Sequence, residues 1–382
     1  MNVLFVIHTP RDIHTAVYKN CCHLGAFLEK QGHKATILTP QDFPDLTRWH
    51  SRWVPIFYPF WVAWWLLRWG EEYDLAVFHS FAGWVVNLFR WLIPSYQRLR
   101  TLTSFHGLEP LYYDALKREM EKVGQPLRLK FRLIHGVLIP WLVRLSCRRS
   151  DRIMCLNCEE ADYLVRNKWA DKSRVAVISN GVPQEFFIPR EYAPEARRLL
   201  FVGQWQEMKG IRYLVEVFSM LARQAPELEL WCMGTLLEEE KVLARFPENL
   251  RSRVVVSPRL EHKELLAVYR DADMFLFPSL SEGFSTALLE AMAMALPVVA
   301  TPVGAAPDFL ESGVNALLVP KGDATALADS VRRLLNDVTL RERLGFQAQV
   351  TAAEYEMKRV DERVVSLFEE ALMTKTSLHC RN

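Results

Sequence analysis

The feature that most constrains the fold is an alternation of short, continuously apolar runs with longer segments of helical periodicity. Continuous apolar strands separated by helices are typical of a parallel sheet that is covered by helices on both faces. In the first half of the chain the expected strands are 3–7, 34–38, 75–79, 102–105, 152–156 and 174–178, with a helix at 16–31. The pattern then restarts, with expected strands at 198–202, 228–233, 254–257, 274–278, 298–300 and 316–319 and helices at 211–224, 262–270, 285–294 and 324–336.

This restart divides the chain of 382 residues into two domains. The segment 183–194 begins and ends with proline and has little periodicity, as expected of a linker. The predicted fold class is α/β, with two doubly wound, Rossmann-like domains at 1–182 and 183–354 that face a central cleft. A final helix within 355–382 is expected to pack back toward the first domain. In such folds, ligands bind beyond the carboxyl ends of the strands.

A chemically informative segment follows the fourth expected strand of the second domain. Ser285 is a plausible helix N-cap before a run of strong helix formers, so the amides around 284–286 are available to bind phosphate oxygens. Gly283 permits close approach of the backbone, Glu290 is placed to accept hydrogen bonds from ribose hydroxyls, and Glu282 is placed to reach a sugar. The alternative is an ordinary buried helix with two solvated acids, because this spacing of glutamates is weak by itself.

A second element follows the first strand of the second domain, at 203–210. Lys209 stands beside Gly210 just before an expected helix, and a lysine there suits a diphosphate leaving group. The alternative is a surface lysine at a helix start. The helix dipole makes a cation slightly unfavourable at that position, which favours a functional role.

Several segments taken together resemble the family 4 retaining glycosyltransferases, also called group 1, which have the GT-B fold. These segments are Phe201-Val-Gly followed by Lys209-Gly, Ala272-Asp-Met-Phe-Leu-Phe-Pro-Ser-Leu-Ser-Glu-Gly-Phe, Glu290-Ala-Met-Ala-Met-Ala-Leu-Pro-Val-Val-Ala-Thr, Gly313-Val-Asn-Ala-Leu-Leu-Val-Pro and Ser179-Asn-Gly-Val. The resemblance is strong over 175–330 and weaker over the front half.

The resemblance implies a donor site in the second domain. There Lys209 would contact the donor diphosphate, Glu290 would hold the ribose, and Glu282 would face the donor sugar. The further donor-binding positions that it implies are Gly203, Gln204, Gly210, Gly283, Phe284, Ser285 and Thr286. In the first domain, the segment Ser-Phe-His-Gly at 104–107 resembles the family's His-Gly segment after a strand. His106 would then lie over the anomeric region of the transferred sugar and act in catalysis with Glu282 and Lys209; by residue type alone, it reads as a loop histidine that caps a neighbouring helix.

The chain departs from the family pattern at two places. The family usually has an arginine after the glycine of the 203–210 loop, and here that position is Gln204. The family also usually has paired glycines after the first strand, where this chain has His-Thr-Pro-Arg-Asp-Ile-His-Thr at 8–15. The candidates to replace the missing positive charge are Arg11, Arg212 and Arg259.

No metal or cofactor is expected beyond a nucleotide diphosphate sugar as donor substrate. Asp271 and Asp273 are separated by one residue, but they precede a strand and so lie away from the expected site. Cys155 and Cys158 form an isolated pair without the second pair of ligands that a structural zinc site needs. Seven cysteines without a regular framework favour a reducing compartment.

The front half has the composition of an acceptor domain that meets an anionic surface. Residues 1–181 hold 24 Lys and Arg against 16 Asp and Glu, and ten of the twelve tryptophans. Aromatic residues crowd one segment beside arginines, namely Trp49, Trp53, Phe57, Tyr58, Phe60, Trp61, Trp64, Trp65 and Trp69 with Arg48, Arg52 and Arg68. A second basic and apolar stretch runs over 127–149. This pattern predicts peripheral binding to an anionic membrane and a lipid-linked acceptor; the alternative is that some of these aromatics are buried against the front sheet.

The expected function is retaining transfer of a hexose from a nucleotide diphosphate sugar to an acceptor hydroxyl, with an acceptor that is lipid-linked or belongs to cell-envelope glycan synthesis. Two alternatives stay open, a non-catalytic relic that binds a sugar nucleotide or a partner protein, and a transferase with a soluble acceptor. No nucleic-acid partner is expected. The start of the chain has no basic segment or cleavage site of a signal peptide, and its longest uncharged run, 54–67, is shorter than the roughly 20 residues of a spanning helix. A cytoplasmic location, at most peripheral on the cytoplasmic face of a membrane, is therefore expected.

Overall fold

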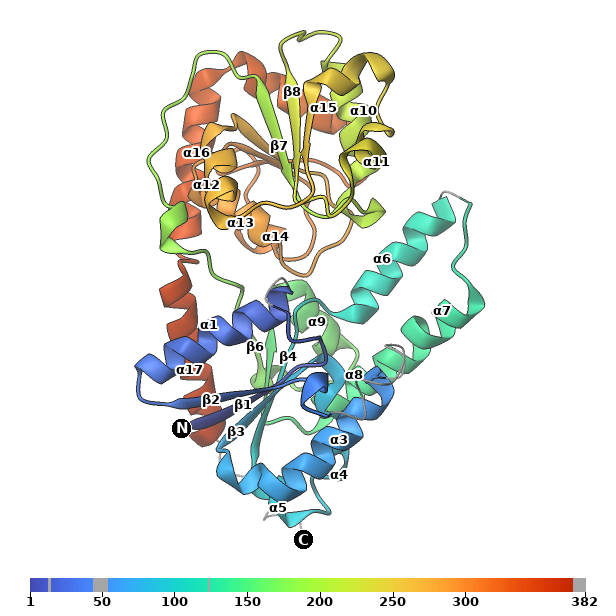
Figure 1. Cartoon of the computed structure of the whole chain (residues 1–382), viewed down its shortest axis with the longest axis vertical. Coiled ribbons are helices and arrows are strands. Elements are labelled where there is room, and N and C mark those ends of the chain that lie inside the picture. The colour runs from blue at the N-terminus through green and yellow to red at the C-terminus, as the bar shows by residue number, and fades with distance from the viewer. Residues whose placement is uncertain (13–14, 44–53, 123, 374–382) are drawn as a thin grey trace. The chain divides into compact units, whose positions relative to one another are not determined.

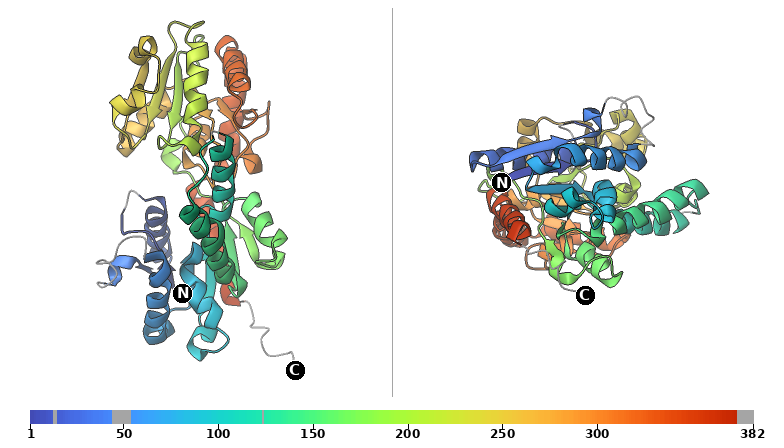
Figure 2. Two further views of the ribbon diagram at one scale, coloured as in Figure 1. Left: turned by 90° about the vertical axis from the view of Figure 1, so that its right-hand side faces the viewer. Right: turned by 90° about the horizontal axis from the view of Figure 1, so that it is seen from below.

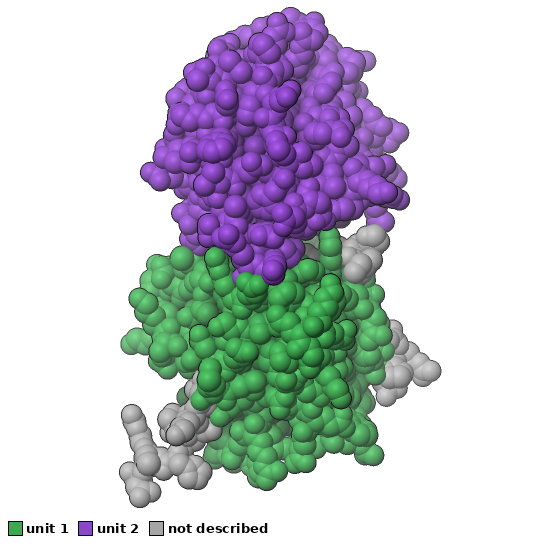
Figure 3. Space-filling model, turned by 90° about the vertical axis from the view of Figure 1, so that its left-hand side faces the viewer, with its two compact units in different colours: residues 1–179, 360–382 green, residues 180–359 purple. Residues whose placement is uncertain are grey.

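The computed structural model describes residues 1–12, 15–43, 54–122 and 124–373. The chain divides into two compact units (Figure 3), unit 1 with residues 1–179 and 360–382 and unit 2 with residues 180–359. Some residues that the sequence singled out lie outside the described part, namely His14, Arg48, Trp49, Arg52 and Trp53.

Unit 1 is built on a parallel sheet of six strands in the order β2-β1-β3-β4-β5-β6 (Figure 1). The strands are β1 Asn2–Val6, β2 Lys34–Leu38, β3 Leu75–His79, β4 Arg100–Ser104, β5 Arg152–Cys155 and β6 Val175–Val177. Its helices are α1 Ala16–Lys30, α3 Val54–Trp69, α4 Trp84–Phe89, α5 Pro94–Arg98, α6 Glu109–Lys122, α7 Leu129–Leu133, α8 Ile139–Arg148, α9 Cys158–Arg166 and most of α17 Met357–Met373. A single π-helical turn, η4 Ile134–Leu138, joins α7 to α8.

The two faces of this sheet are covered by different helices, because side chains alternate along a strand. On β1, Val3 and Phe5 pack with residues of α1 and α17. Leu4 and Val6 pack on the other face with residues of α3, α4 and α8. Helices α6 and α7 project away from the sheet and form a helical arm (Figures 1 and 2).

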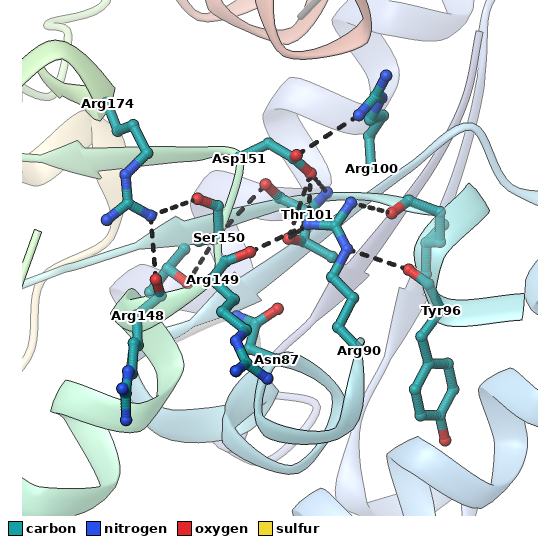
Figure 4. A network of polar contacts seen from close by, with 12 residues as sticks. Asn87, Arg90, Tyr96, Arg100, Thr101, Arg148, Arg149, Ser150, Asp151 and Arg174 are labelled. Atoms are coloured by element: carbon teal, nitrogen blue, oxygen red, sulfur yellow. Dashed lines mark hydrogen bonds and ion pairs between the residues drawn. The ribbon is translucent and has the colours of Figure 1, made fainter. Parts of the chain in front are cut away.

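A buried polar network fixes the amino-terminal edge of the unit 1 sheet to its helices (Figure 4). The guanidinium group of Arg90 donates to the carbonyls of Tyr96, Leu99 and Arg149 at 3.1, 2.8 and 3.0 Å. It also pairs with Asp151, at 2.8 Å between Nη1 and Oδ2. A buried arginine is tolerated only when its donors are satisfied in this way, so the network holds the ends of three helices at fixed positions on the sheet.

Unit 2 repeats the architecture with a second six-stranded parallel sheet in the order β12-β11-β10-β7-β8-β9. The strands are β7 Arg198–Val202, β8 Glu229–Met233, β9 Val254–Ser257, β10 Met274–Phe277, β11 Val298–Ala300 and β12 Leu317–Leu318. The helices are α10 Ile211–Leu221, α11 Glu239–Leu243, α12 His262–Asp271, α13 Thr286–Ala293, α14 Ala306–Phe309, α15 Ala324–Asn336 and α16 Val338–Ala353. One face packs on α10 and α15, and the other packs on α12, α13 and α16.

The predicted fold class is confirmed, because each unit is a doubly wound parallel sheet and each expected strand has its counterpart. The boundaries shift by a few residues where the local chemistry is ambiguous. The helix expected at 211–224 ends at Leu221, just before a turn that leads to Pro226. The strand expected at 316–319 is reduced to Leu317–Leu318 at the edge of its sheet.

Candidate functional site

The candidate site of unit 2 is formed by the loops that follow two neighbouring strands, β7 and β10. The backbone amide of Leu280 donates to the carbonyl of Met208 at 2.8 Å, which ties the two loops together. Gly210 sits at the closest approach, with a φ of +73°. A Cβ atom at this position would lie 1.9 Å from the carbonyl oxygen of Pro278, so only glycine fits.

This contact brings Lys209 and Glu282 into a two-pronged ion pair. The Lys209 Nζ atom lies 2.6 and 2.8 Å from the two carboxylate oxygens of Glu282. The hydroxyl of Ser279 donates to the same carboxylate at 2.9 Å. The side chain of Glu282 is 8% exposed and that of Lys209 is 28% exposed, so the ion pair is largely buried and is weakly screened by solvent and salt.

A third loop supports the Glu282 turn from behind. Thr301 Oγ1 donates to the Ser279 carbonyl at 2.5 Å, and the amide of Ala305 donates to the Gly283 carbonyl at 3.1 Å. A Cβ atom at Gly304, where φ is +56°, would lie 2.5 Å from the carbonyl oxygen of Glu282. The loop after β11 therefore fixes the backbone that carries the glutamate.

The amino end of α13 comes directly after the turn that carries Glu282. Ser285 is its N-cap, as predicted, and its hydroxyl accepts from the amide of Leu288 at 3.3 Å. No acidic residue occupies the first turn. The first amides of a helix have no intrahelical acceptor, so the amides of Thr286 and Ala287 carry the positive end of the helix dipole and are suited to an anion. Phe284 packs on Phe309, with ring centroids 6.2 Å apart.

Glu290 lies on the same helix and is oriented by a residue that sequence reasoning did not find. The hydroxyl of Tyr269, on α12, lies 2.8 Å from Glu290 Oε2 and 3.1 Å from the Ala287 carbonyl oxygen. Burial, and then the nearby Glu290 carboxylate, raise the pKa of Tyr269 well above its usual value. The tyrosine thus stays a neutral donor that holds one carboxylate oxygen.

Gln204 is exposed at the end of β7 and receives a hydrogen bond from the Gln206 amide group at 2.6 Å. Of the arginines considered as replacements for its missing charge, Arg212 pairs with Glu216 on its own helix at 3.4 Å and Arg259 is exposed in the loop after β9. Arg11 belongs to unit 1, where it pairs with Asp42 at 2.6 Å.

Of the cysteine pair considered as a metal site, Cys155 is buried and Cys158 is exposed, and the acidic pair has other partners. Asp273 Oδ2 accepts the backbone amides of Arg197 and Arg198 at 2.7 and 2.8 Å, at the amino end of β7. Asp271 pairs with Arg270 at 2.9 Å. Across the described ranges, no cluster of three or more His, Cys, Asp or Glu residues has the arrangement of a metal site.

In unit 1, His106 follows β4 and forms part of a polar cluster at the carboxyl edge of the sheet. The imidazole Nε2 of His106 lies 2.7 Å from Nδ1 of His79. Burial lowers the pKa of His106 to about 4, and the nearby His8 adds to this effect. The loop itself is anchored by Glu160, whose carboxylate accepts the amides of Leu108 and Leu156 at 2.9 and 3.0 Å.

The aromatic residues predicted to meet a membrane divide between the core and the surface. Tyr58 is buried, and Trp61 and Trp65 pack partly against the core. Two helical stripes are exposed, one with Phe60, Trp64 and Leu67 on α3 and one with Leu133, Val137 and Trp141 on α7, η4 and α8. The Trp84 ring joins the stripes, with centroids 5.2 Å from Phe60 and 6.2 Å from Trp141. We call these seven apolar residues, of which Trp84 is buried and the other six are exposed, the aromatic face.

Comparison with known families gives two matches that lie side by side along the chain. A model described as Glycosyltransferase Family 4 matches residues 21–186. A model described as Glycosyl transferases group 1 matches residues 196–337.

Among curated proteins, the chain is similar to D-inositol 3-phosphate glycosyltransferases of several species. It is 31% identical to the protein of Paenarthrobacter aurescens over 235 residues, which is 58% of this chain and 58% of that protein. It is 34% identical to the protein of Corynebacterium urealyticum over 242 residues, which is 55% of this chain and 57% of that protein. The chain thus spans somewhat more than half the length of these relatives.

Among solved structures, the chain resembles the sucrose-phosphate synthase of Thermosynechococcus elongatus, with a TM-score of 0.76, 20% identity and coverage of 97% of this chain and 98% of that one. It also resembles Anabaena HepE in complex with UDP-glucose, with a TM-score of 0.69, 16% identity and coverage of 97% and 100%. At these identities the likeness concerns the fold. The two family matches cover all strands of the two sheets except β1, and they place this chain in the family 4, group 1 glycosyltransferases of GT-B fold.

Proposed function

We propose that this protein transfers a hexose, with retention of configuration, from a nucleotide diphosphate sugar to an acceptor hydroxyl. The observation that carries the proposal is the pairing of Lys209 with Glu282 beside the amino end of α13, with Glu290 farther along the same helix. A sugar nucleotide needs positive charge for its phosphates and hydrogen-bond acceptors for its hydroxyls. The carboxyl end of this sheet offers both, with a lysine and helix amides for the phosphates and two carboxylates for the hydroxyls.

Each part of the sugar nucleotide is assigned to the protein groups that match its chemistry. The diphosphate binds Lys209 and the first amides of α13, because both stabilise the negative charge that develops on the leaving group. Glu290, held by Tyr269, accepts from the ribose hydroxyls, and Glu282 accepts from hydroxyls of the sugar. With Gln204 in place of a cation, Lys209 and the helix end hold the phosphates.

The comparisons support this assignment by analogy. The curated relatives are named as glycosyltransferases of inositol 3-phosphate, and the HepE neighbour was solved with UDP-glucose. In the proposed reaction the nucleoside diphosphate leaves from the face that the acceptor attacks, and the donor phosphate takes the acceptor proton. No protein nucleophile is assigned. No metal takes part in the proposed reaction, because Lys209 and the helix amides supply the positive charge.

A thermal-shift screen with UDP-, GDP- and ADP-glucose tests donor binding, because a ligand that binds the native state raises its melting temperature. One of the three should raise it, and the Lys209→Ala variant should lose most of that shift. Lys241→Ala is the matched control, because it removes a lysine of the same unit that is also paired at 2.6 Å, with Glu238. Equal losses in both variants would contradict the assignment of Lys209.

Turnover is tested separately, by release of nucleoside diphosphate from the donor that binds. Release at a rate that falls in Glu282→Gln and is unchanged by EDTA supports a metal-independent transferase. Strict dependence on a divalent cation would overturn the metal-independent mechanism. Binding without any release would favour a relic that holds a sugar nucleotide, an alternative that rests on Gln204.

The aromatic face supports the further proposal that the acceptor is lipid-linked and that unit 1 binds the cytoplasmic surface of an anionic membrane. The segments 46–70 and 122–150 carry most of this face, and neither contains Asp or Glu. Segment 122–150 also contains seven Lys and Arg residues. Arg144 and Arg148 continue the exposed stripe of α8, and Arg149 lies over the Trp91 ring at 5.7 Å. Exposed aromatics flanked by arginine suit a membrane interface. No helix within the described residues is long and apolar enough to span a membrane.

Co-sedimentation with vesicles tests this part of the proposal. Binding to vesicles with about one-third anionic lipid at low salt should fall in a Trp64→Ser, Trp141→Ser double variant. Phe346→Ser is the control, because Phe346 is an equally exposed aromatic residue of unit 2. Equal binding by the double variant and the control, or no binding by the unaltered protein, would contradict a membrane-bound unit 1 and favour a soluble acceptor.

A further inference from the structure

Three histidines of unit 1 meet at the carboxyl edge of its sheet, and only one of them was recognised from the sequence. His8 follows β1, His79 ends β3 and His106 follows β4. The strands β1, β3 and β4 are consecutive in the sheet, so their ends bring the three rings together. Sequence similarity gave a role to His106 alone.

His79 and His106 are joined by a hydrogen bond in the plane of the rings. Their Nδ1 and Nε2 atoms are 2.7 Å apart. The ring planes are inclined by 10° and the centroids are 4.7 Å apart. Two parallel rings stacked face to face hold their atoms at least about 3.4 Å apart, the van der Waals separation. The shorter distance therefore means that the rings lie edge to edge, and one nitrogen donates to the other.

The second nitrogen of His79 is also occupied. Its Nε2 atom lies 3.4 Å from the Sγ atom of Cys21, on α1. Burial raises the pKa of the Cys21 thiol far above its usual value, so the sulfur keeps its proton and can donate it in a hydrogen bond. A neutral imidazole carries one proton, so a donor at Nε2 places the His79 proton on Nδ1, facing His106.

His79 is held rigidly by its surroundings. The His8 ring packs on the ring of Phe81, two residues after His79, with centroids 4.9 Å apart. The next residue, Ser80, has a φ of +56°, and its hydroxyl donates to the carboxylate of Glu109. A non-glycine residue in this conformation costs about 1 kcal/mol or more, and such strain persists where the surroundings over-determine it.

We propose that His79 is a positioning residue which, with Cys21 at its other nitrogen, fixes His106 with its proton on Nδ1. His106 then accepts from His79 through Nε2 and presents an N–H donor at Nδ1. That atom has no hydrogen-bond partner in the part of the chain that the structure describes. On the proposed function, this N–H donates to a hydroxyl oxygen of the substrate, so His106 orients a sugar rather than removing a proton from it.

The tautomer can be measured directly in the full chain labelled with ¹⁵N-histidine, by long-range ¹H–¹⁵N correlation without any substrate. The His106 signal is assigned by its loss in His106→Gln. We expect a protonated Nδ1 and an unprotonated Nε2 at pH 7. Protonation at Nε2 in the unaltered protein would overturn the inference.

Variants separate positioning from a structural role. Asparagine at position 79 can still donate to His106, whereas leucine cannot, so His79→Leu should lower kcat by about ten- to a hundredfold and His79→Asn by much less. The donor KM should change by less than about threefold, because the donor contacts in unit 2 are intact. Similar losses in both variants, with similar falls in melting temperature, would mean that His79 is only a packing residue.

The thiol has its own matched control. Cys21→Ala should mix the two tautomers of His106, Cys21→Ser should preserve the Nδ1–H form, and Cys147→Ala, which removes another buried thiol of unit 1, should leave the tautomer unchanged. An unchanged tautomer in Cys21→Ala would remove Cys21 from the proposal. Because the tautomer is read without substrate, a protein with the expected tautomer but no turnover would refute the proposed function and leave the positioning intact.

Discussion

Gly210→Ala should damage unit 2 through a single backbone contact. The added Cβ would start 1.9 Å from the Pro278 carbonyl oxygen, against an ordinary contact of 3.4 Å or more. One loop must therefore move by more than 1 Å relative to the other. Alanine at position 210 would also have to adopt a φ of +73°, in the left-handed region.

The expected cost is the sum of these two effects. Left-handed backbone costs a non-glycine residue about 1–2 kcal/mol, and overpacking costs about 1–3 kcal/mol more. Gly210→Ala should therefore destabilise unit 2 by about 2–5 kcal/mol. Gly313→Ala isolates the first effect, because Gly313 has a φ of +81° and a Cβ there meets nothing within 4 Å. It should cost about 1–2 kcal/mol.

Scanning calorimetry of the two variants beside the unaltered protein measures the difference. For a unit of this size, 1 kcal/mol corresponds to about 2–4 °C, so the transition of unit 2 should fall by about 4–20 °C in Gly210→Ala and by less than half of that in Gly313→Ala. Separation of the loops also displaces Lys209 from Glu282, so Gly210→Ala should lose the donor-induced shift that Gly313→Ala keeps. Equal melting temperatures for the two variants would refute the reasoning, since the backbone contact would then have no cost.

Three further outcomes follow from single contacts. Tyr269→Phe removes the hydrogen bond from the Tyr269 hydroxyl to Glu290 and should weaken binding of the sugar nucleotide about tenfold by titration. Tyr192→Phe, which removes a comparable hydroxyl bound to the Ala295 carbonyl, should leave this affinity unchanged, and equal effects of the two variants would contradict an orienting role for Tyr269. In Arg90→Lys, the ammonium group cannot reach all the acceptors of the guanidinium group, so the free energy of unfolding should fall by about 3 kcal/mol in denaturant titration. The exposed Arg98→Lys should lose less than about 0.5 kcal/mol. A similarly small loss in Arg90→Lys would mean that the network does not stabilise the fold. Burial raises the pKa of Glu160 to about 7, above its unfolded value of 4.5, so stability is lost as pH rises from about 4.5 to 7. The stability of Glu160→Gln relative to the unaltered protein should increase by about 2.5 kcal/mol between pH 5 and pH 8, and a difference independent of pH would contradict this shift.

The sheets could be predicted from the sequence because their strands are buried on both faces. Apolar runs such as Leu199–Phe201 and Val298–Ala300 have no polar residue to break the pattern, and the intervening helices have clear periodicity. The position of the candidate site followed from the same reasoning, since the loops that carry Lys209 and Glu282 come directly after strands.

The pairings within the site could not be predicted in the same way. Lys209 and Glu282 are 73 positions apart, and their contact depends on β7 lying next to β10, an adjacency that is absent from the linear pattern. Tyr269 looks in the sequence like one more core aromatic residue of an amphipathic helix. Gly304 looks like any turn glycine, because its need for space comes from the Glu282 carbonyl of another loop.

The cluster of unit 1 illustrates the same limit for histidine. A single histidine at the end of a strand carries no signal of its own, and His8 and His79 lie 71 positions apart in the printed sequence. Their significance arises only when the strand order places β1, β3 and β4 side by side. A useful sequence signal would have been the recurrence of histidine after consecutive strands of one sheet.

The ion pair of Lys209 also bears on the missing positive charge at Gln204. A free lysine loses roughly 2 kcal/mol of side-chain entropy when a ligand orders it. Here Lys209 is already held by both oxygens of Glu282, which Ser279 holds in turn, so most of that ordering is complete before a donor arrives. On the proposed function, an arriving diphosphate attracts the ammonium group and repels the carboxylate, and Glu282 turns from the lysine to the sugar hydroxyls. Preorganisation of the ammonium group therefore offsets part of the cost of separating this ion pair, and the same movement links phosphate binding to recognition of the sugar.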